Sequence, residues 1–128
     1  MPARDKSTLD LAKEIFDAFN AHDLDRIMSY FAEDCSLDMP RGPDEWGQRF
    51  VGRAAVRKGL AARFEGLPDV RYSEDRHWGS GNRVVSEWLL TGTKTGGERV
   101  RVRGCDHYEF HDGQVIRKDS YWKIVERP

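Results

Sequence analysis

Only two cysteines occur in the 128 residues, Cys35 and Cys105, which is too few for a disulfide framework and shows no metal-ligand spacing. Neither sign of charge is in excess: 21 lysines and arginines stand against 22 aspartates and glutamates, for a net charge of −1. This balance gives no reason to expect nucleic acid or an anionic membrane as an obligatory partner. Both cysteines lie in apolar, strand-like stretches, so we expect unpaired thiols in a reducing compartment, the cytoplasm.

Long apolar runs are also missing. No stretch of about 18 apolar residues could span a membrane, and residues 1–6 (MPARDK) lack the apolar core of a signal peptide. No glycine-rich strand-to-helix loop indicates a nucleotide site, and no histidine–carboxylate spacing indicates a metal site. The sequence therefore predicts no metal and no organic cofactor, and its length predicts one domain over residues 1–128.

The first half of the chain has the periodicity of helices. Ser7 is a candidate N-cap, and the apolar residues after it fall on one helical stripe that ends near Asn20. Asp23 can cap a short second helix, and a third helix is predicted over residues 54–65, ending at Gly66. The stripe of the first helix consists of Leu11, Ala12, Ile15, Phe16 and Phe19.

Between the second and third helices, residues 35–39 predict a brief strand and residues 40–52 a loop. The loop is rich in glycine and proline but also carries Trp46 and Phe50. Long loops with large apolar side chains usually pack as lids or pocket mouths rather than as disordered linkers. We therefore predict that Trp46 is one of the ligand contacts.

The second half of the chain changes to the period of two that is typical of strands. Turn signals separate the strands at Gly81-Asn82, Gly96-Gly97 and Asp112-Gly113. Helices followed by a meander of long strands predict an α+β fold: a cone-shaped, curved antiparallel sheet with three N-terminal helices packed over its apolar face. A cone of this size can hold a pocket. The predicted strands cover residues 70–78, 84–95, 99–110 and 115–125.

One acidic residue stands out in the strand predicted over 99–110. Alternation places Asp106 on the same face as Val102 and Tyr108, where it is the only charged side chain. A buried carboxylate must be hydrogen-bonded, paired or protonated, and perturbed carboxylates tend to gather in functional clefts. A structural role, such as capping a loop or lying at the wet end of the strand, is the alternative.

Three stretches carry a resemblance to a known superfamily: NAHDLDRIMSYFAEDC, VGRAAVRKGL and CDHYEFHDGQVIRKDSYW. With the order of elements, they resemble nuclear transport factor 2-like proteins, closest to the SnoaL-like polyketide cyclase and ketosteroid isomerase branches. The resemblance implies that Asp106 corresponds to an oxyanion-binding aspartic acid in the isomerases, or to the general acid/base aspartate in the cyclases. It also implies that Ile15 replaces the isomerase tyrosine and Met39 the isomerase base, with Asp38 one residue early, so steroid isomerisation itself is not predicted.

Two further residues are candidate proton carriers. Alternation turns Asp38 outward, although Pro40 could bend the strand and turn it back. His77 belongs to a polar face, but it lies near a strand end where a bulge often changes the parity. If buried near Asp106, His77 would form an acid/base pair with it. The predicted catalytic set is therefore Asp106, His77 and Asp38.

Aromatic side chains on the inward faces of the strands predict the walls of a mostly apolar pocket. Trp88 and Trp122 are the strongest candidates, and Tyr108, two residues from Asp106, could donate a hydrogen bond. The full predicted set of ligand contacts is Trp88, Tyr108, Trp122, Ile15, Met39, Phe19 and Trp46.

These residues favour an enzyme that binds a small, largely apolar carbonyl compound and moves a proton by isomerisation, cyclisation or hydration, without a cofactor. The alternative is a non-catalytic small-molecule binding protein of the same fold, which the missing tyrosine and displaced Asp38 would suit. A protein-interaction module is a third class. Val85, Leu89 and Thr91 make the outer face of one strand unusually apolar, which predicts a homodimer through the sheet.

Overall fold

The helices form where capping residues and apolar stripes predict them. The computed structural model describes residues 6–126. The Ser7 hydroxyl accepts a hydrogen bond from the backbone N–H of Asp10 at 3.0 Å, and Asp23 accepts one from Arg26 at 3.1 Å. The helices are α1 (Thr8–Asn20), α2 (Leu24–Met28) and α3 (Arg53–Gly66).

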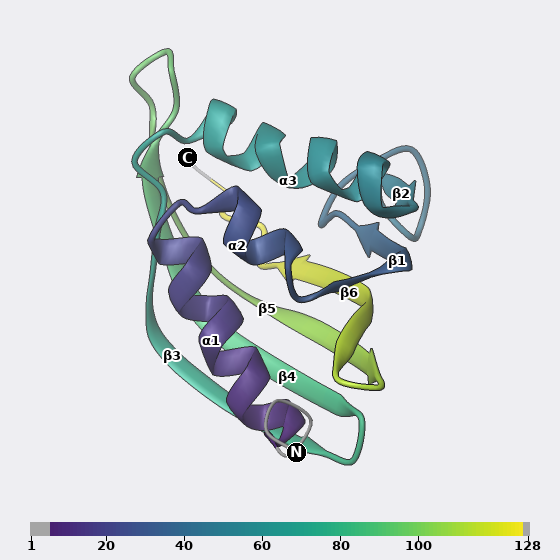
Figure 1. The fold of residues 1–128 in the computed structure, drawn as a ribbon. Helices are drawn as coiled ribbons and strands as arrows, with labels where there is room; N and C mark the ends of the chain where they lie inside the picture. Colours follow the sequence, from purple (N-terminus) through teal and green to yellow (C-terminus); the bar gives the residue numbers. More distant parts are fainter. Residues whose placement is uncertain (1–5, 127–128) are drawn as a thin grey trace.

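Six strands form one curved sheet, and the three helices lie over one of its faces (Figure 1). The sheet order is β2-β1-β6-β5-β4-β3. The predicted α+β fold is confirmed, with two additions: β1 pairs with β6 in parallel, and β2 lies inside the predicted loop 40–52. The strands are β1 (Phe31–Asp38), β2 (Arg49–Val51), β3 (Arg71–Ser80), β4 (Arg83–Thr93), β5 (Arg99–His111) and β6 (Gln114–Trp122).

A bulge in β3 changes which of its side chains face the helices. The register with β4 shifts between Ser73 and Arg76, where Glu74 takes a φ of 52°. Simple alternation would leave His77 on the outer face, but the extra residue places it opposite Ser86, which points toward the helices. The bulge therefore turns His77 into the cone.

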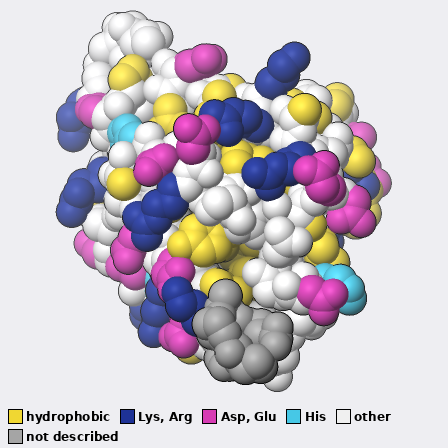
Figure 2. Space-filling view, viewed as in Figure 1, with side chains coloured by type: hydrophobic (Ala, Val, Ile, Leu, Met, Phe, Trp, Pro, Cys, Tyr) yellow, Lys and Arg dark blue, Asp and Glu magenta, His cyan; other side chains and the backbone are white. Residues whose placement is uncertain are grey.

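The core fills the space between the helices and the sheet, with Trp88, Phe110 and Ile15 among its largest fully buried side chains. On the side that the helices cover, acidic and basic side chains are interspersed (Figure 2). Cys35 is buried and Cys105 half-buried, and both thiols are unpaired as predicted. Within residues 6–126, no helix is long and apolar enough to cross a membrane.

Candidate functional site

Asp106 lies inside the cone, as its place on the apolar face of β5 predicts. Its exposed fraction is 6%. The carboxylate accepts three hydrogen bonds: from Trp88 Nε1 at 2.9 Å, from Lys118 Nζ at 3.0 Å and from Ser120 Oγ at 2.5 Å. Trp88 comes from β4, and the other two donors come from β6, so three adjacent strands build this shell. The buried charge is thus paired and hydrogen-bonded, as burial requires.

Lys118 is the residue that the sequence analysis missed. Its ammonium group is buried with Asp106, also contacts Ser120 Oγ at 2.8 Å, and lies 5.3 Å from the centre of the Phe19 ring. The alternation that turns Ser120 and Trp122 inward also turns Lys118 inward, so the signal was present in the sequence. A cationic donor strengthens a hydrogen bond to a carboxylate. The ion pair makes Asp106 a hydrogen-bond acceptor at rest rather than a donor.

Two small cavities border Asp106, each with a volume of about 10 Å³, room for about one water molecule. They share Phe19, Tyr72 and Trp88 as walls, together with Asp106 itself. Of the other predicted ligand contacts, Tyr108 borders the first cavity, and Met39 and Trp122 border the second. Ile15 does not line either cavity, because α1 buries it completely in the core.

Tyr108 brings a free donor to the first cavity. It is 3% exposed, and its hydroxyl makes no hydrogen bond with any residue from 6 to 126. Burial first, and then the negative charge of Asp106, raise the pKa of Tyr108 well above its usual value, so the hydroxyl keeps its proton. Because no fully buried side-chain donor among the described residues lacks a partner, the Tyr108 hydroxyl faces the open space of the cavity, where a water or a ligand oxygen can accept its hydrogen bond.

His77 belongs to a hydrogen-bonded chain that reaches the same cavity. Its side chain is 4% exposed; Nε2 lies 2.8 Å from Asp75 Oδ2, and Nδ1 lies 2.8 Å from Ser86 Oγ. A carboxylate only accepts, so Nε2 carries a proton and donates to Asp75, while Nδ1 and the Ser86 hydroxyl share the second hydrogen bond. The expected direct pair with Asp106 is not formed, because Ser86, the cross-strand neighbour of Asp106, stands between them.

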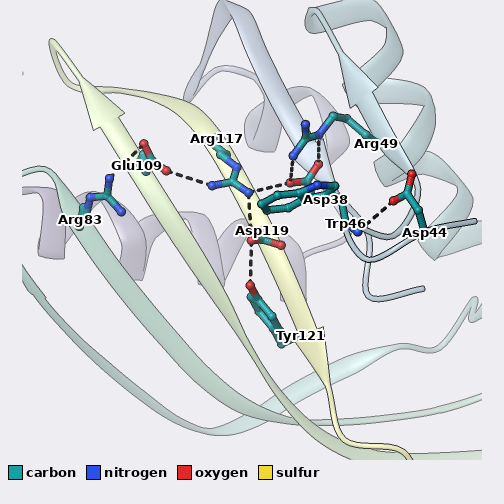
Figure 3. A network of polar contacts seen from close by, with 9 residues as sticks. All are labelled: Asp38, Asp44, Trp46, Arg49, Arg83, Glu109, Arg117, Asp119 and Tyr121. Carbon is teal, nitrogen blue, oxygen red and sulfur yellow. Dashed lines mark hydrogen bonds and ion pairs between the residues drawn. The ribbon is translucent and has the colours of Figure 1, made fainter. Parts of the chain in front are cut away.

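Asp38 points to the outer face of the sheet, as alternation predicts, but it is fully buried there (Figure 3). Arg49 donates from Nε and Nη2 at 2.7 and 2.9 Å, and Arg117 donates from Nη2 at 2.9 Å. Trp46 covers the pair, with its ring 5.0 Å from the Arg49 guanidinium carbon and 5.7 Å from that of Arg117. This corrects two predictions: Asp38 is walled off from the cone, and Trp46 belongs to the outer network instead of the pocket.

The outer network has its own electrostatics. Hydrogen bonds from Arg49 are the main reason that the pKa of Asp38 is lowered. The network continues through Arg117 to Glu109 at 3.3 Å and to Asp119 at 3.2 Å. Burial raises the pKa of Asp119, against the opposing charge of Arg117. Among the described residues, no group of three His, Cys, Asp or Glu side chains is placed to hold a metal ion.

A family model of the SnoaL-like domain matches residues 12–118. The chain belongs to the SnoaL-like domain family. No curated protein matches this SnoaL-like chain. Its cone has the nuclear transport factor 2-like architecture that the resemblance implied. A solved nuclear transport factor 2-like protein from Burkholderia pseudomallei K96243 superposes on it with a TM-score of 0.79 and 20% sequence identity, covering 92% of each chain.

Other solved structures superpose equally well on this SnoaL-like protein. A candidate polyketide cyclase from Xanthomonas campestris pv. campestris has a TM-score of 0.80 and 24% identity, covering 91% of this chain and 90% of that chain. A second, from Pseudomonas putida KT2440, has a TM-score of 0.83 and 18% identity over 93% of each chain. At these identities the likeness shows the fold alone.

Proposed function

We propose that this SnoaL-like protein binds a small, largely apolar carbonyl compound in the cone and catalyses a proton transfer on it without a cofactor. The observation that carries this proposal is the ionised, fully hydrogen-bonded Asp106 beside two cavities. Two of its structural relatives carry the name of candidate polyketide cyclases, and cyclisation of a carbonyl compound is one of the proton-transfer reactions proposed here. We propose a cytoplasmic location as well, since unpaired thiols suit a reducing compartment.

In the proposed step, Asp106 takes a proton from the carbon next to the ligand's carbonyl group. The electron pair of that C–H bond forms a carbon–carbon double bond, and the π pair of the carbonyl group moves onto its oxygen, which gives an enolate. Lys118 and Tyr108 are the donors for the enolate oxygen, and such donors stabilise the charge that develops in the transition state. Asp106 then returns the proton to a carbon of the ligand, and the carbonyl group forms again.

Binding requires the two cavities to join, since each alone holds about one water molecule. Phe19 borders both, so its side chain must move aside for them to join, and the joined space must widen further to admit a ligand larger than two water molecules. The small cavities and the complete shell of donors around Asp106 also suit the alternative, a non-catalytic binding protein. The His77–Ser86 chain would, in the catalytic case, connect the first cavity with Asp75 at the surface.

The experiment is α-proton exchange of 2-tetralone, an aromatic ketone, followed by NMR in deuterated buffer. We expect the protein to accelerate deuterium uptake, and Asp106→Asn to reduce that rate by about 10²–10⁴-fold, because asparagine cannot exchange a proton. Glu87→Gln on the outer face of β4 is the matched control, since its carboxylate is remote from the cavities and pairs with Arg76.

Asp106→Asn leaves the Lys118 ammonium without its partner, so the double variant Asp106→Asn/Lys118→Met tests the same loss with a neutral pair. Circular dichroism checks that each variant is folded. Tetralone that binds without exchanging in the wild-type protein would establish the binding-protein alternative. An exchange rate in folded Asp106→Asn equal to that of Glu87→Gln would contradict the proposal.

We further propose that two copies pair through the outer face of the sheet. Trp46, Trp78 and Tyr121 lie on this side with about half of their surfaces exposed. Large exposed apolar side chains on one face are typical of an interface. We expect a dimer in light scattering at micromolar concentration and a shift to monomer in Trp78→Glu. A wild-type protein that remains monomeric at these concentrations would contradict this proposal.

A further inference from the structure

Arg63 on α3 brings a positive charge to the second cavity. Its guanidinium carbon lies 4.5 Å from the centre of the Trp122 ring, and the half-exposed side chain forms part of the cavity wall. Its charge also acts on Tyr72: burial is the main cause that raises the pKa of this tyrosine, and Arg63 opposes the shift. Arg63 therefore lies at the edge of the cone, with its charge felt inside.

The other arginines of α3 bind carbonyl or carboxylate groups of the protein, whereas Arg63 has the Trp122 ring and the Tyr72 side chain as neighbours. Arg53 donates to the carbonyl groups of Met28 and Phe31, both at 2.6 Å. Arg57 forms an ion pair with Asp25 at 2.5 Å. Across the part of the chain that the structure describes, Arg63 forms no ion pair with a carboxylate. Helix α3 thus directs one arginine, without an acidic partner, to the cavity.

The charges that line the cavities do not cancel. Asp106 and Lys118 form one neutral ion pair at 3.0 Å, which leaves Arg63 as the remaining charge of the lining. Aromatic rings connect the two ends: Trp122 lies under Arg63 and meets Trp88 edge-on at 6.5 Å. Trp88 in turn donates its hydrogen bond to Asp106. A net positive, aromatic-walled cavity favours a flat ligand with one negative charge.

We infer that Arg63 is an anion subsite and that the ligand is an aromatic or conjugated carboxylate. The planar guanidinium matches a carboxylate through two parallel hydrogen bonds. The apolar body of the ligand lies against Trp122 and Trp88, which leaves its carbonyl group toward Asp106. This inference rests on the proposed function because it uses the same cavity, and it names the class of substrate.

Calorimetric titration with 2-naphthoate and its neutral analogue 2-naphthamide tests the subsite. The two probes share one ring system and differ in charge. We expect the wild-type protein to bind naphthoate at least about tenfold more tightly than naphthamide, the value of a charge-assisted hydrogen bond. Arg63→Gln reduces this ratio to less than about twofold, Arg63→Lys keeps part of it, and Arg57→Gln on the same helix leaves it unchanged.

The ratio of the two affinities is the decisive readout, because a general loss of packing against Trp122 would weaken both probes alike. Equal affinities in the wild-type protein, no binding of naphthoate up to millimolar concentration, or an unchanged ratio in Arg63→Gln would each overturn the subsite. Its failure differs from failure of the proposed function. Rapid tetralone exchange that depends on Asp106, without naphthoate selectivity, would leave the proton transfer standing and make the substrate neutral.

Discussion

Two carboxylates lie buried on opposite faces of the same sheet, and their surroundings differ. Asp106 faces the helices and borders two cavities, with Lys118 as its single cation. Asp38 faces outward, is held between Arg49 and Arg117, and lines neither of those cavities. Both are fully hydrogen-bonded. Burial of a charge therefore does not by itself indicate a functional site; the open space beside the charge distinguishes Asp106.

The cations also differ in their access to water. Lys118 has 8% of its side chain exposed, whereas Arg49 has 45% and Arg117 has 29%. When a partner is lost, an exposed guanidinium can take up water, but a buried group cannot. The inner pair should therefore be the more sensitive of the two to the loss of one member.

The largest stability effect is expected from Lys118→Met, which keeps the length of the side chain and removes its charge. Asp106 then remains buried without a cation, and we expect a loss of about 3–5 kcal/mol in the free energy of unfolding, measured by urea denaturation. Replacing both members, in Asp106→Leu/Lys118→Met, should restore most of the stability. A loss below about 1 kcal/mol in the single variant would show that Trp88 and Ser120 alone support the carboxylate.

A smaller effect is expected from Asp38→Asn on the outer face. We expect a loss of about 1.5–3 kcal/mol at pH 7, the range for hydrogen bonds to charged groups, because the freed arginines can be hydrated. Tetralone exchange per folded molecule should remain at the wild-type rate. A lower exchange rate without a change in stability would show that Asp38 takes part in catalysis, and the proposed difference in role between Asp38 and Asp106 would be wrong.

The pH dependence of the Asp38→Asn effect gives a control. The folded protein lowers the pKa of Asp38. Asp38 therefore contributes to the free energy of unfolding above its pKa in the unfolded chain, about 3.9, and this contribution is lost as the pH falls through its pKa in the folded protein. The difference in the free energy of unfolding between the wild-type protein and Asp38→Asn should therefore disappear at acidic pH. Asp119 has a raised pKa, so the sign is reversed. Its contribution to the free energy of unfolding is present below the unfolded pKa of about 3.9 and is lost as the pH rises through its pKa in the folded protein.

Most of the fold could be predicted from the sequence because its signals are local. Ser7 and Asp23 cap the helices, and period-two patterns define the four long strands. The parallel pairing of β1 with β6 could not be predicted, since it joins strands that are far apart in the sequence and leaves no periodic pattern. Strand β2 was missed because its three residues, Arg49–Val51, are too few to show alternation.

The site was predicted less completely than the fold. The alternation of β5 correctly predicts that Asp106 faces the cone. The same alternation along β6, which turns Ser120 and Trp122 inward, also predicts an inward-facing Lys118. The inward orientation of His77 depends on the bulge at Glu74. The positive φ of Glu74 cannot be predicted from the sequence, because glutamate has no preference for that conformation. The burial of Asp38 depended on Arg117, a residue 79 positions away, so it was beyond any local pattern.

The place of β6 between β1 and β5 has a consequence for how the protein is made. The chain must extend through β6 before β1 has a neighbour on that side and before Asp106 has a cation. Long-range pairing of this kind slows folding, because a large loop must close before its contacts contribute. On the ribosome, the helices and the β3–β4–β5 meander can form early, but the proposed catalytic pair is assembled only after β6 has been synthesised.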